Sequence, residues 1–152
     1  MPTSNAAPAF AAIMLLTGIG IPILASLNSG LGLRLEAPMA ASVLLFSLGL
    51  LVAIAGALVT GSLGQVRLSS GIPFHFYLGG LFMAFYVIAV TFIAPRFGVG
   101  NAIFFVLLGQ LISASTIDHF GLFGSLQYSI DGKRIAGIAL MIAGVYLARR
   151  SA

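Results

Sequence analysis

The stretch that decides the fold class is residues 38–62, PMAASVLLFSLGLLVAIAGALVTGS, which contains no Asp, Glu, Lys or Arg. The hydrocarbon core of a bilayer is about 30 Å thick, and about 20 helical residues cross it. Four further stretches of this kind lie at about 9–29, 73–94, 100–117 and 135–148. The stretch 135–148 is the shortest, but basic residues flank it, and their long side chains can extend to the membrane interfaces. We therefore predict five transmembrane helices.

The composition leaves no room for a water-soluble domain. Hydrophobic residues make up 60% of the 152 residues and charged residues 7%, whereas about a quarter of a soluble domain is charged. The chain has no cysteine, and no spacing of its other residues resembles a hydrolytic triad, a two-carboxylate site or a metal site. We predict one all-α membrane domain over residues 1–152, embedded in the lipid bilayer. It is not expected to be an enzyme, nor to use a cofactor or a metal.

The net charge of +4 comes from residues at the predicted helix ends, which is typical of interfacial anchoring and not of nucleic-acid binding. The first stretch also lacks the charged region that begins a signal peptide, because Met1–Phe10 contains no Lys or Arg. We expect it to be retained as a helix; a cleaved leader is the alternative.

The basic residues do not favour either orientation of the chain. Five spans place Arg67, Lys133 and Arg134 on one side and Arg34, Arg96, Arg149 and Arg150 on the other, three against four. An excess of Lys and Arg on one side normally fixes orientation. Either another factor sets a single orientation, or the chain inserts both ways and pairs as an antiparallel homodimer. Such a dimer would reproduce the inverted repeats of many transporters in a ten-helix assembly.

Polar and helix-breaking residues inside the spans are candidates for a solute pathway. Pro22 removes a backbone donor in mid-span, and kinked helices often line transporter cavities. Gln110 lies near the centre of its span, where an amide must face protein or water. The candidate pathway residues are Pro22, Ser26, Asn28, Phe85, Tyr86, Gln110 and Ser113. For Gln110 the alternative is hydrogen bonding between helices. For Pro22 the alternative is a kink whose free carbonyl is satisfied by Ser26 or by a neighbouring helix.

Two further groups have candidate roles. Small residues at helical spacing form predicted packing seams, because they let helix backbones approach closely in lipid; the glycines are Gly49, Gly56, Gly79, Gly80, Gly137 and Gly144. Asp118 and His119 end the fourth stretch and form a candidate gate or proton-handling pair, since His titrates near neutral pH. The alternative is a cap at the helix C-terminus.

Motifs in order along the chain resemble the YdcZ family, a branch of the drug/metabolite transporter superfamily whose members are small five-helix bacterial membrane proteins. The matching stretches are Pro22 with residues 28–32 (NSGLG), 46–49 (FSLG), 77–80 (YLGG), 85–87 (FYV), 94–98 (APRFG), 109–110 (GQ), 118–122 (DHFGL), 134–137 (RIAG) and 144–145 (GV). The chain departs from the family at His75 and Phe76, where a tryptophan often precedes the paired glycines, and at Met83, where a third glycine is common. These departures affect interface anchoring and the packing of the third helix.

The resemblance implies two five-helix halves of inverted topology in the bacterial cytoplasmic (inner) membrane. We accordingly expect a multi-pass transporter that moves a small organic solute by alternating access as a dual-topology homodimer. The alternatives are a dual-topology ion channel and a scaffold subunit that transports nothing. The only glutamate is Glu36, in a predicted loop, so a membrane-embedded glutamate of the kind that couples small multidrug exporters to protons is missing. A neutral or anionic solute fits this chain better.

Overall fold

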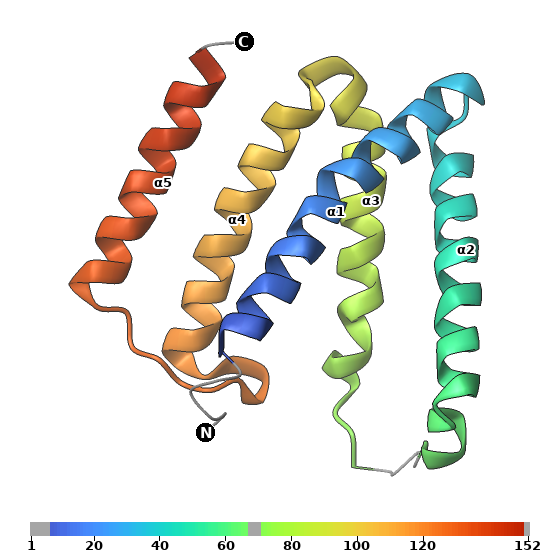
Figure 1. The fold of residues 1–152 in the computed structure, drawn as a ribbon, viewed down its shortest axis with the longest axis horizontal. Helices are drawn as coiled ribbons and strands as arrows, with labels where there is room; N and C mark the ends of the chain where they lie inside the picture. The colour runs from blue at the N-terminus through green and yellow to red at the C-terminus, as the bar shows by residue number, and fades with distance from the viewer. Residues whose placement is uncertain (1–6, 67–70, 151–152) are drawn as a thin grey trace. The chain divides into compact units, whose positions relative to one another are not determined.

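The computed structural model describes residues 7–66 and 71–150, and every regular element in them is a helix. The elements in chain order (Figure 1) are α1 (Ala7–Arg34), α2 (Pro38–Val59), the 3₁₀ helices η1 (Ser62–Gln65) and η2 (Phe74–Leu78), α3 (Gly79–Phe97), α4 (Val99–Phe120), the 3₁₀ helix η3 (Leu122–Gly124) and α5 (Gly132–Arg150). The predicted all-α class is confirmed. Arg67, which the charge count used, lies outside the described residues.

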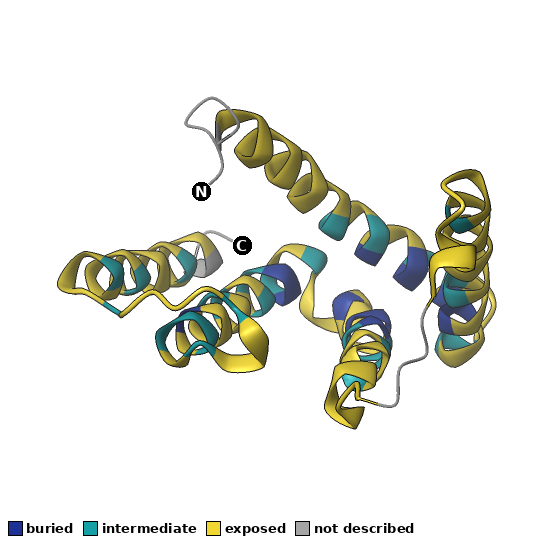
Figure 2. Cartoon of the chain, turned by 90° about the horizontal axis from the view of Figure 1, so that it is seen from below, coloured by how far each residue is buried: buried dark blue, intermediate teal, exposed yellow. Residues whose placement is uncertain are grey.

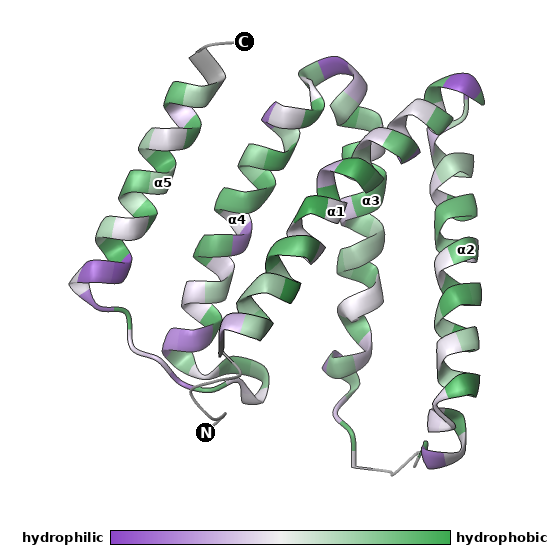
Figure 3. Cartoon of the chain, in the orientation of Figure 1, coloured by the Kyte–Doolittle hydropathy of each residue, from purple (hydrophilic) through white to green (hydrophobic). Residues whose placement is uncertain are grey.

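Four segments are long and apolar enough to cross a membrane: Pro8–Arg34, Pro38–Val59, Phe74–Phe97 and Val99–Phe120. Hydrophobic residues run along these helices, and hydrophilic ones gather at the helix ends and turns (Figure 3). Helix α5 differs because Lys133 and Arg134 lie in its first turn and Arg149 and Arg150 at its end. The fifth predicted segment is therefore confirmed as a helix, and its crossing of the bilayer stays a prediction.

Helices α3 and α4 each end just before a glycine with a positive φ angle. Gly98 follows α3 with φ +88°, and Gly121 follows α4 with φ +61°. Glycine adopts such positive φ angles without the steric cost that a Cβ imposes. Helices α3 and α4 therefore extend three residues beyond the predicted ends at 94 and 117.

Contacts within the chain divide it into two units, Met1–Val99 and Gly100–Ala152. In the first unit, α1, α2 and α3 pack against one another. The buried positions lie in the second half of α1, at the start of α2 and in the second half of α3 (Figure 2). The buried apolar side chains of these helices are short ones: Ala25, Ala41, Val87, Val90 and Ala94. Short side chains allow the close backbone approach that holds helices together in lipid.

Gly32 lies where α1 closely approaches both α2 and α3. A Cβ added to Gly32 would lie 3.1 Å from the Cα of Pro38 and 3.2 Å from the Cγ2 of Thr91. The neighbour at 3.1 Å is backbone, which cannot rotate away as the end of a side chain can. The missing side chain at position 32 therefore sets the spacing of α1 from α2 and α3.

We expect Gly32→Ala to lower the free energy of unfolding by about 1–3 kcal/mol, the usual cost of forcing extra volume into a packed interface. Gly30→Ala is the matched control in the same helix, since an added Cβ there meets nothing within 4 Å. Unfolding of the two variants in detergent, followed by circular dichroism, measures the difference. Equal stability of the two variants would contradict this account of the crossing.

Most other apolar side chains are exposed in the single chain. Leu16 of α1 is 68% exposed, Leu51 of α2 is 63% exposed and Phe82 of α3 is 71% exposed. Residues 8–20 of α1 are exposed without interruption. A membrane protein can leave such surfaces to lipid or cover them with another protein chain.

Candidate functional site

A buried polar pair joins α1 to α3. Asn28 is 3% exposed and Thr91 is 2% exposed. The Nδ2 of Asn28 donates to the Oγ1 of Thr91 at 2.6 Å, and that hydroxyl donates to the backbone oxygen of Val87 at 2.7 Å. Buried polar groups need such partners, because an unpaired amide in an apolar setting costs several kcal/mol. In this structure, Asn28 therefore connects two helices.

Two buried serines lie on neighbouring parts of α1 and α2 and bond within their own helices. The hydroxyl of Ser29 donates to the backbone oxygen of Ala25 at 2.6 Å, and that of Ser42 donates to the backbone oxygen of Pro38 at 3.2 Å. Both side chains are thereby satisfied without a partner from another helix. The first unit thus places four polar residues in an interior that is otherwise lined by small apolar side chains.

The Asn28–Thr91 bond should give a measurable coupling energy. We expect a double-mutant cycle with Asn28→Leu and Thr91→Val to give an interaction of about 0.6–1.7 kcal/mol, the range found for hydrogen bonds between membrane helices. Ser47 is a suitable control because its exposed hydroxyl bonds only to Val43 of its own helix. Asn28→Leu and Ser47→Ala should be additive. Additivity of the Asn28 and Thr91 variants as well would show that the bond does not stabilise the fold.

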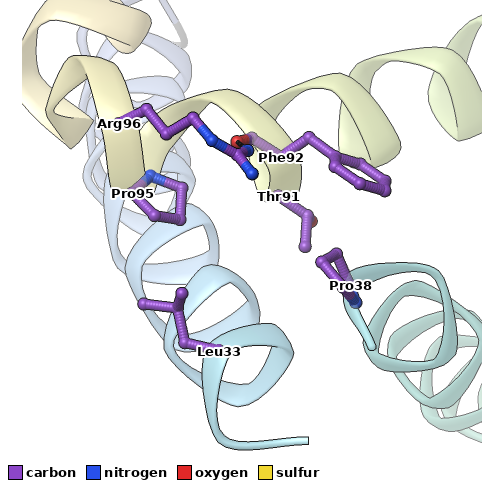
Figure 4. Close-up of a pocket in the computed structure, with 6 residues that line it drawn as sticks. All are labelled: Leu33, Pro38, Thr91, Phe92, Pro95 and Arg96. Atoms are coloured by element: carbon purple, nitrogen blue, oxygen red, sulfur yellow. Dashed lines mark hydrogen bonds between the residues drawn. The ribbon is translucent and has the colours of Figure 1, made fainter. Parts of the chain in front are cut away.

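A small hollow adjoins this pair at the end of the first unit. It has a volume of about 180 Å³ and is lined by Leu33, Pro38, Thr91, Phe92, Pro95 and Arg96. Figure 4 shows that α1, α2 and α3 each contribute to it, and that the Arg96 side chain folds back beside Phe92. The Nη1 of Arg96 donates to the backbone oxygen of Phe92 at 2.6 Å. One cation thus lies at the rim of a largely apolar hollow.

The other pathway candidates of the first unit are placed differently. Pro22 is half-buried and Ser26 is exposed, so Ser26 does not join the buried face of Asn28. Phe85 is 72% exposed. The Tyr86 hydroxyl oxygen is buried and has no hydrogen-bond partner among the described residues. An unpaired buried hydroxyl calls for a water, a ligand or another chain.

The candidates of the second unit lie on α4. Gln110 and Ser113 are both exposed in the single chain. They are three residues apart and therefore share one face of the helix. Ser115, which the sequence analysis did not single out, is 2% exposed, and its hydroxyl has no partner among the described residues. Helix α4 thus carries polar side chains on two of its faces.

The C-terminus of α4 is capped by the loop that leads to α5. The carboxylate of Asp118 accepts a hydrogen bond from Arg134 at 2.7 Å, and its backbone oxygen accepts one from the Tyr128 amide at 2.9 Å. The Nδ1 of His119 accepts a hydrogen bond from the Ile130 amide at 3.1 Å. The last carbonyls of a helix have no partners within it, and the loop supplies them.

Two further side chains of this loop donate to carbonyls at the end of α4. Gln127 Nε2 donates to the His119 backbone oxygen at 3.0 Å, and Ser125 Oγ donates to the Ile117 backbone oxygen at 3.3 Å. Asp131 in turn accepts from the Arg134 amide at 2.8 Å and so caps the start of α5. A gating or proton-handling role for Asp118 and His119 stays a prediction.

The predicted packing glycines do not pack within the described chain. A Cβ added at Gly49, Gly56, Gly79, Gly80, Gly137 or Gly144 would meet nothing within 4 Å. The glycine of the first unit that packs against neighbouring helices is Gly32. In the sequence it stood out only as part of a family motif. Which glycine packs depends on where helices cross, and spacing along one helix does not reveal that. The six predicted glycines remain candidates for contacts with another chain.

Sequence reasoning predicted none of the six residues that line the hollow as site residues, and Thr91 and Arg96 are the two polar ones among them. Thr91 is a polar residue inside the stretch 73–94, as Gln110 is within its own stretch, and the same argument about polar groups in lipid would have found it. Arg96 was counted as an interfacial charge and as part of the motif 94–98, but not as a site residue. Within residues 7–66 and 71–150, no three His, Cys, Asp or Glu side chains lie together so as to hold a metal ion.

The family model described as "Putative inner membrane exporter, YdcZ" matches residues 9–147 of the chain. The match covers the four apolar spans, apart from Pro8 at the start of the first one. It also covers most of α5. Neither the curated proteins nor the solved structures include a significant match.

Proposed function

The chain belongs to the YdcZ family, and from that membership we propose that it carries a small organic solute across the bacterial cytoplasmic membrane by alternating access, as an antiparallel homodimer. It is a multi-pass inner-membrane protein, since the family is described as an inner membrane exporter and four helices are long and apolar enough to span. That description also indicates a transporter and not an enzyme.

The exposure of Gln110 in the single chain is the observation that carries the proposal. Gln110 lies near the middle of α4, one of the four apolar spans, and its side chain is exposed. An amide facing hydrocarbon without a partner costs several kcal/mol. The face of Gln110 and Ser113 must therefore meet water or another protein surface. A solute pathway that is closed by a second copy of the chain supplies both the water and the protein surface.

An inverted second copy fits the charges of the sequence. Basic residues are divided three against four between the two sides, so neither orientation is strongly preferred. The predicted packing glycines, which meet nothing within the chain, would lie free to contact that copy. Two chains together would hold ten helices in the inverted arrangement that many alternating-access transporters have.

The pathway would be lined by amides, hydroxyls and aromatic rings. Its members in this proposal are Pro22, Ser26, Asn28, Phe85, Tyr86, Gln110 and Ser113, with Asp118 and His119 as the candidate gate. The three acidic residues lie at or beyond helix ends, namely Glu36 after α1, Asp118 in the last turn of α4 and Asp131 before α5. A mid-span carboxylate for a cationic solute is thus missing from the described helices, which favours a neutral or anionic solute.

Counterflow in liposomes tests the proposal. A thermal-shift screen of the purified protein first identifies a ligand, because a ligand that binds the folded state alone raises the unfolding temperature. Liposomes loaded with unlabelled ligand should then accumulate labelled ligand transiently. Rapid ion conductance without counterflow would favour the dual-topology channel. A folded dimer that binds no solute, with a dry interior around Gln110, would favour the scaffold.

A further inference from the structure

Two hollows on the first unit meet at Arg96. The smaller, of about 180 Å³, includes Leu33, Pro38 and Pro95 in its lining. The larger and more open one, of about 440 Å³, is lined by Phe92, Ile93, Arg96 and Phe97. Phe92 and Arg96 belong to both. A single guanidinium therefore lies where two apolar hollows adjoin, in the last turn of α3.

The charge of Arg96 is not balanced by a carboxylate. The one ion pair among the described residues is that of Arg134 with Asp118. The acceptor that the structure gives to Arg96 is the Phe92 backbone oxygen, in its own helix. A guanidinium has five N–H donors in a planar fork that matches the oxygens of a carboxylate or a phosphate. Most of these donors remain available to an anion.

We propose that the paired hollows at Arg96 form a binding site for an amphipathic anion, a carboxylate or phosphate at the end of an apolar chain. The anionic group binds the guanidinium at the rim of the smaller hollow. The apolar chain lies in the larger one, against Phe92, Ile93 and Phe97. This site shares no residue with the proposed pathway and its binding is measured without transport, so a failed binding test leaves the proposed function standing.

The surroundings of Arg96 select for this chemistry. The other side chains of the smaller hollow are apolar except for Thr91, whose hydroxyl is occupied by Asn28 and Val87. A polar uncharged solute would therefore find few partners there. A cation would be repelled by the guanidinium, and a fully hydrophilic anion would gain nothing from Phe92 and Phe97. An anion with an apolar chain gains from both.

Short-chain probes test the site in an uncharged detergent. Hexyl phosphate and hexanoate are the anionic probes, and 1-hexanol and hexyltrimethylammonium carry an apolar chain of nearly the same length without a negative charge. The midpoint of thermal unfolding is followed against the concentration of each probe, which gives an apparent Kd. We expect the anionic probes alone to raise the midpoint. An equal response to 1-hexanol would overturn the proposal.

Three variants locate the response. Arg96→Gln should weaken binding by at least about tenfold, because a charge-assisted hydrogen bond is lost. Arg34→Gln is the matched control, since Arg34 is an exposed arginine in the last turn of α1 that lines neither hollow. Leu33→Trp keeps the charge and fills the smaller hollow, so it should weaken binding too. Unchanged binding by folded Arg96→Gln, or full binding by Leu33→Trp, would overturn the site.

A lipid arm identifies the source of the anion. Native mass spectrometry after purification with phosphatidate and phosphatidylcholine shows which lipid the protein retains. Phosphatidate retained by the wild type and lost by Arg96→Gln, without a response to the short probes, supports the site and identifies a lipid headgroup. A response to hexanoate and hexyl phosphate supports it and identifies a free organic anion. Retention of phosphatidate that does not depend on Arg96, without a response to the short probes, would contradict the proposal.

Discussion

A chain whose basic residues are biased to one side of the membrane should be inactive alone and active with an oppositely biased copy. Replacing Gln65, Leu126 and Ser129 by lysine would give the side that now holds three basic residues a clear excess of Lys and Arg. All three positions are exposed loop or 3₁₀ sites, and Leu126 is 75% exposed. Each chain would then insert in one orientation. An antiparallel dimer cannot form from copies that all point the same way.

The complementary chain carries lysines at Leu35, Glu36 and Ser151, on the side that now holds four basic residues. Transport should fall to background with either biased chain and return when the two are expressed together. Labelling checks the premise, because the chain has no cysteine of its own. Cysteines at Ser4 and Ser151 of the unbiased chain should each react with an impermeant reagent from both sides. Reaction of each from one side only would rule out dual insertion.

The sequence predicts the spans well because a charge-free stretch of about 20 residues is a direct requirement of the bilayer. It predicts their ends less well, since polar and basic residues continue a helix into the interface. Arg34 lies inside α1, and Arg96 and Phe97 inside α3. The fifth segment is a helix, but it is not among the four spans that are apolar enough to cross a membrane. The reason is that the basic residues that flank 135–148 belong to the helix itself.

The site is harder to predict because its contacts join residues far apart in the chain. Asn28 was assigned to the pathway, and its hydrogen-bond partner Thr91 is 63 residues away. Gly32 packs because three helices cross there, which no spacing within α1 shows. The local capping of Asp118 and His119 was among the sequence alternatives, because a helix end needs partners wherever it lies.

Loss of the amide at Gln110 is expected to abolish solute transport in a protein that stays folded. The reason is its position near the middle of an apolar span, exposed in the single chain and on one face with Ser113. Gln110→Ala should weaken ligand binding by about tenfold or more, the effect of losing a hydrogen bond in a site from which water is excluded. The dimer and its unfolding midpoint should be retained.

Interhelical hydrogen bonding predicts a different result for the same side chain. In that case Gln110→Leu would lower stability by about 0.6–2 kcal/mol, as for other such bonds in membranes. Gln110→Glu would be worse, because it would place a charge in the same buried position. Transport would then fall only in proportion to the loss of folded dimer.

Reactivity of a cysteine decides between the two roles of Gln110. Gln110→Cys in the cysteine-free chain should react with small aqueous thiol reagents, and bound ligand should slow the reaction. Ile112→Cys is the matched control: Ile112 is 49% exposed and lies two residues on, which is the other side of a helix with 3.6 residues per turn. If Ile112 faces lipid, its thiol should remain unreactive. A folded Gln110→Cys protein as inert as the Ile112 control, with and without ligand, would place Gln110 outside the pathway.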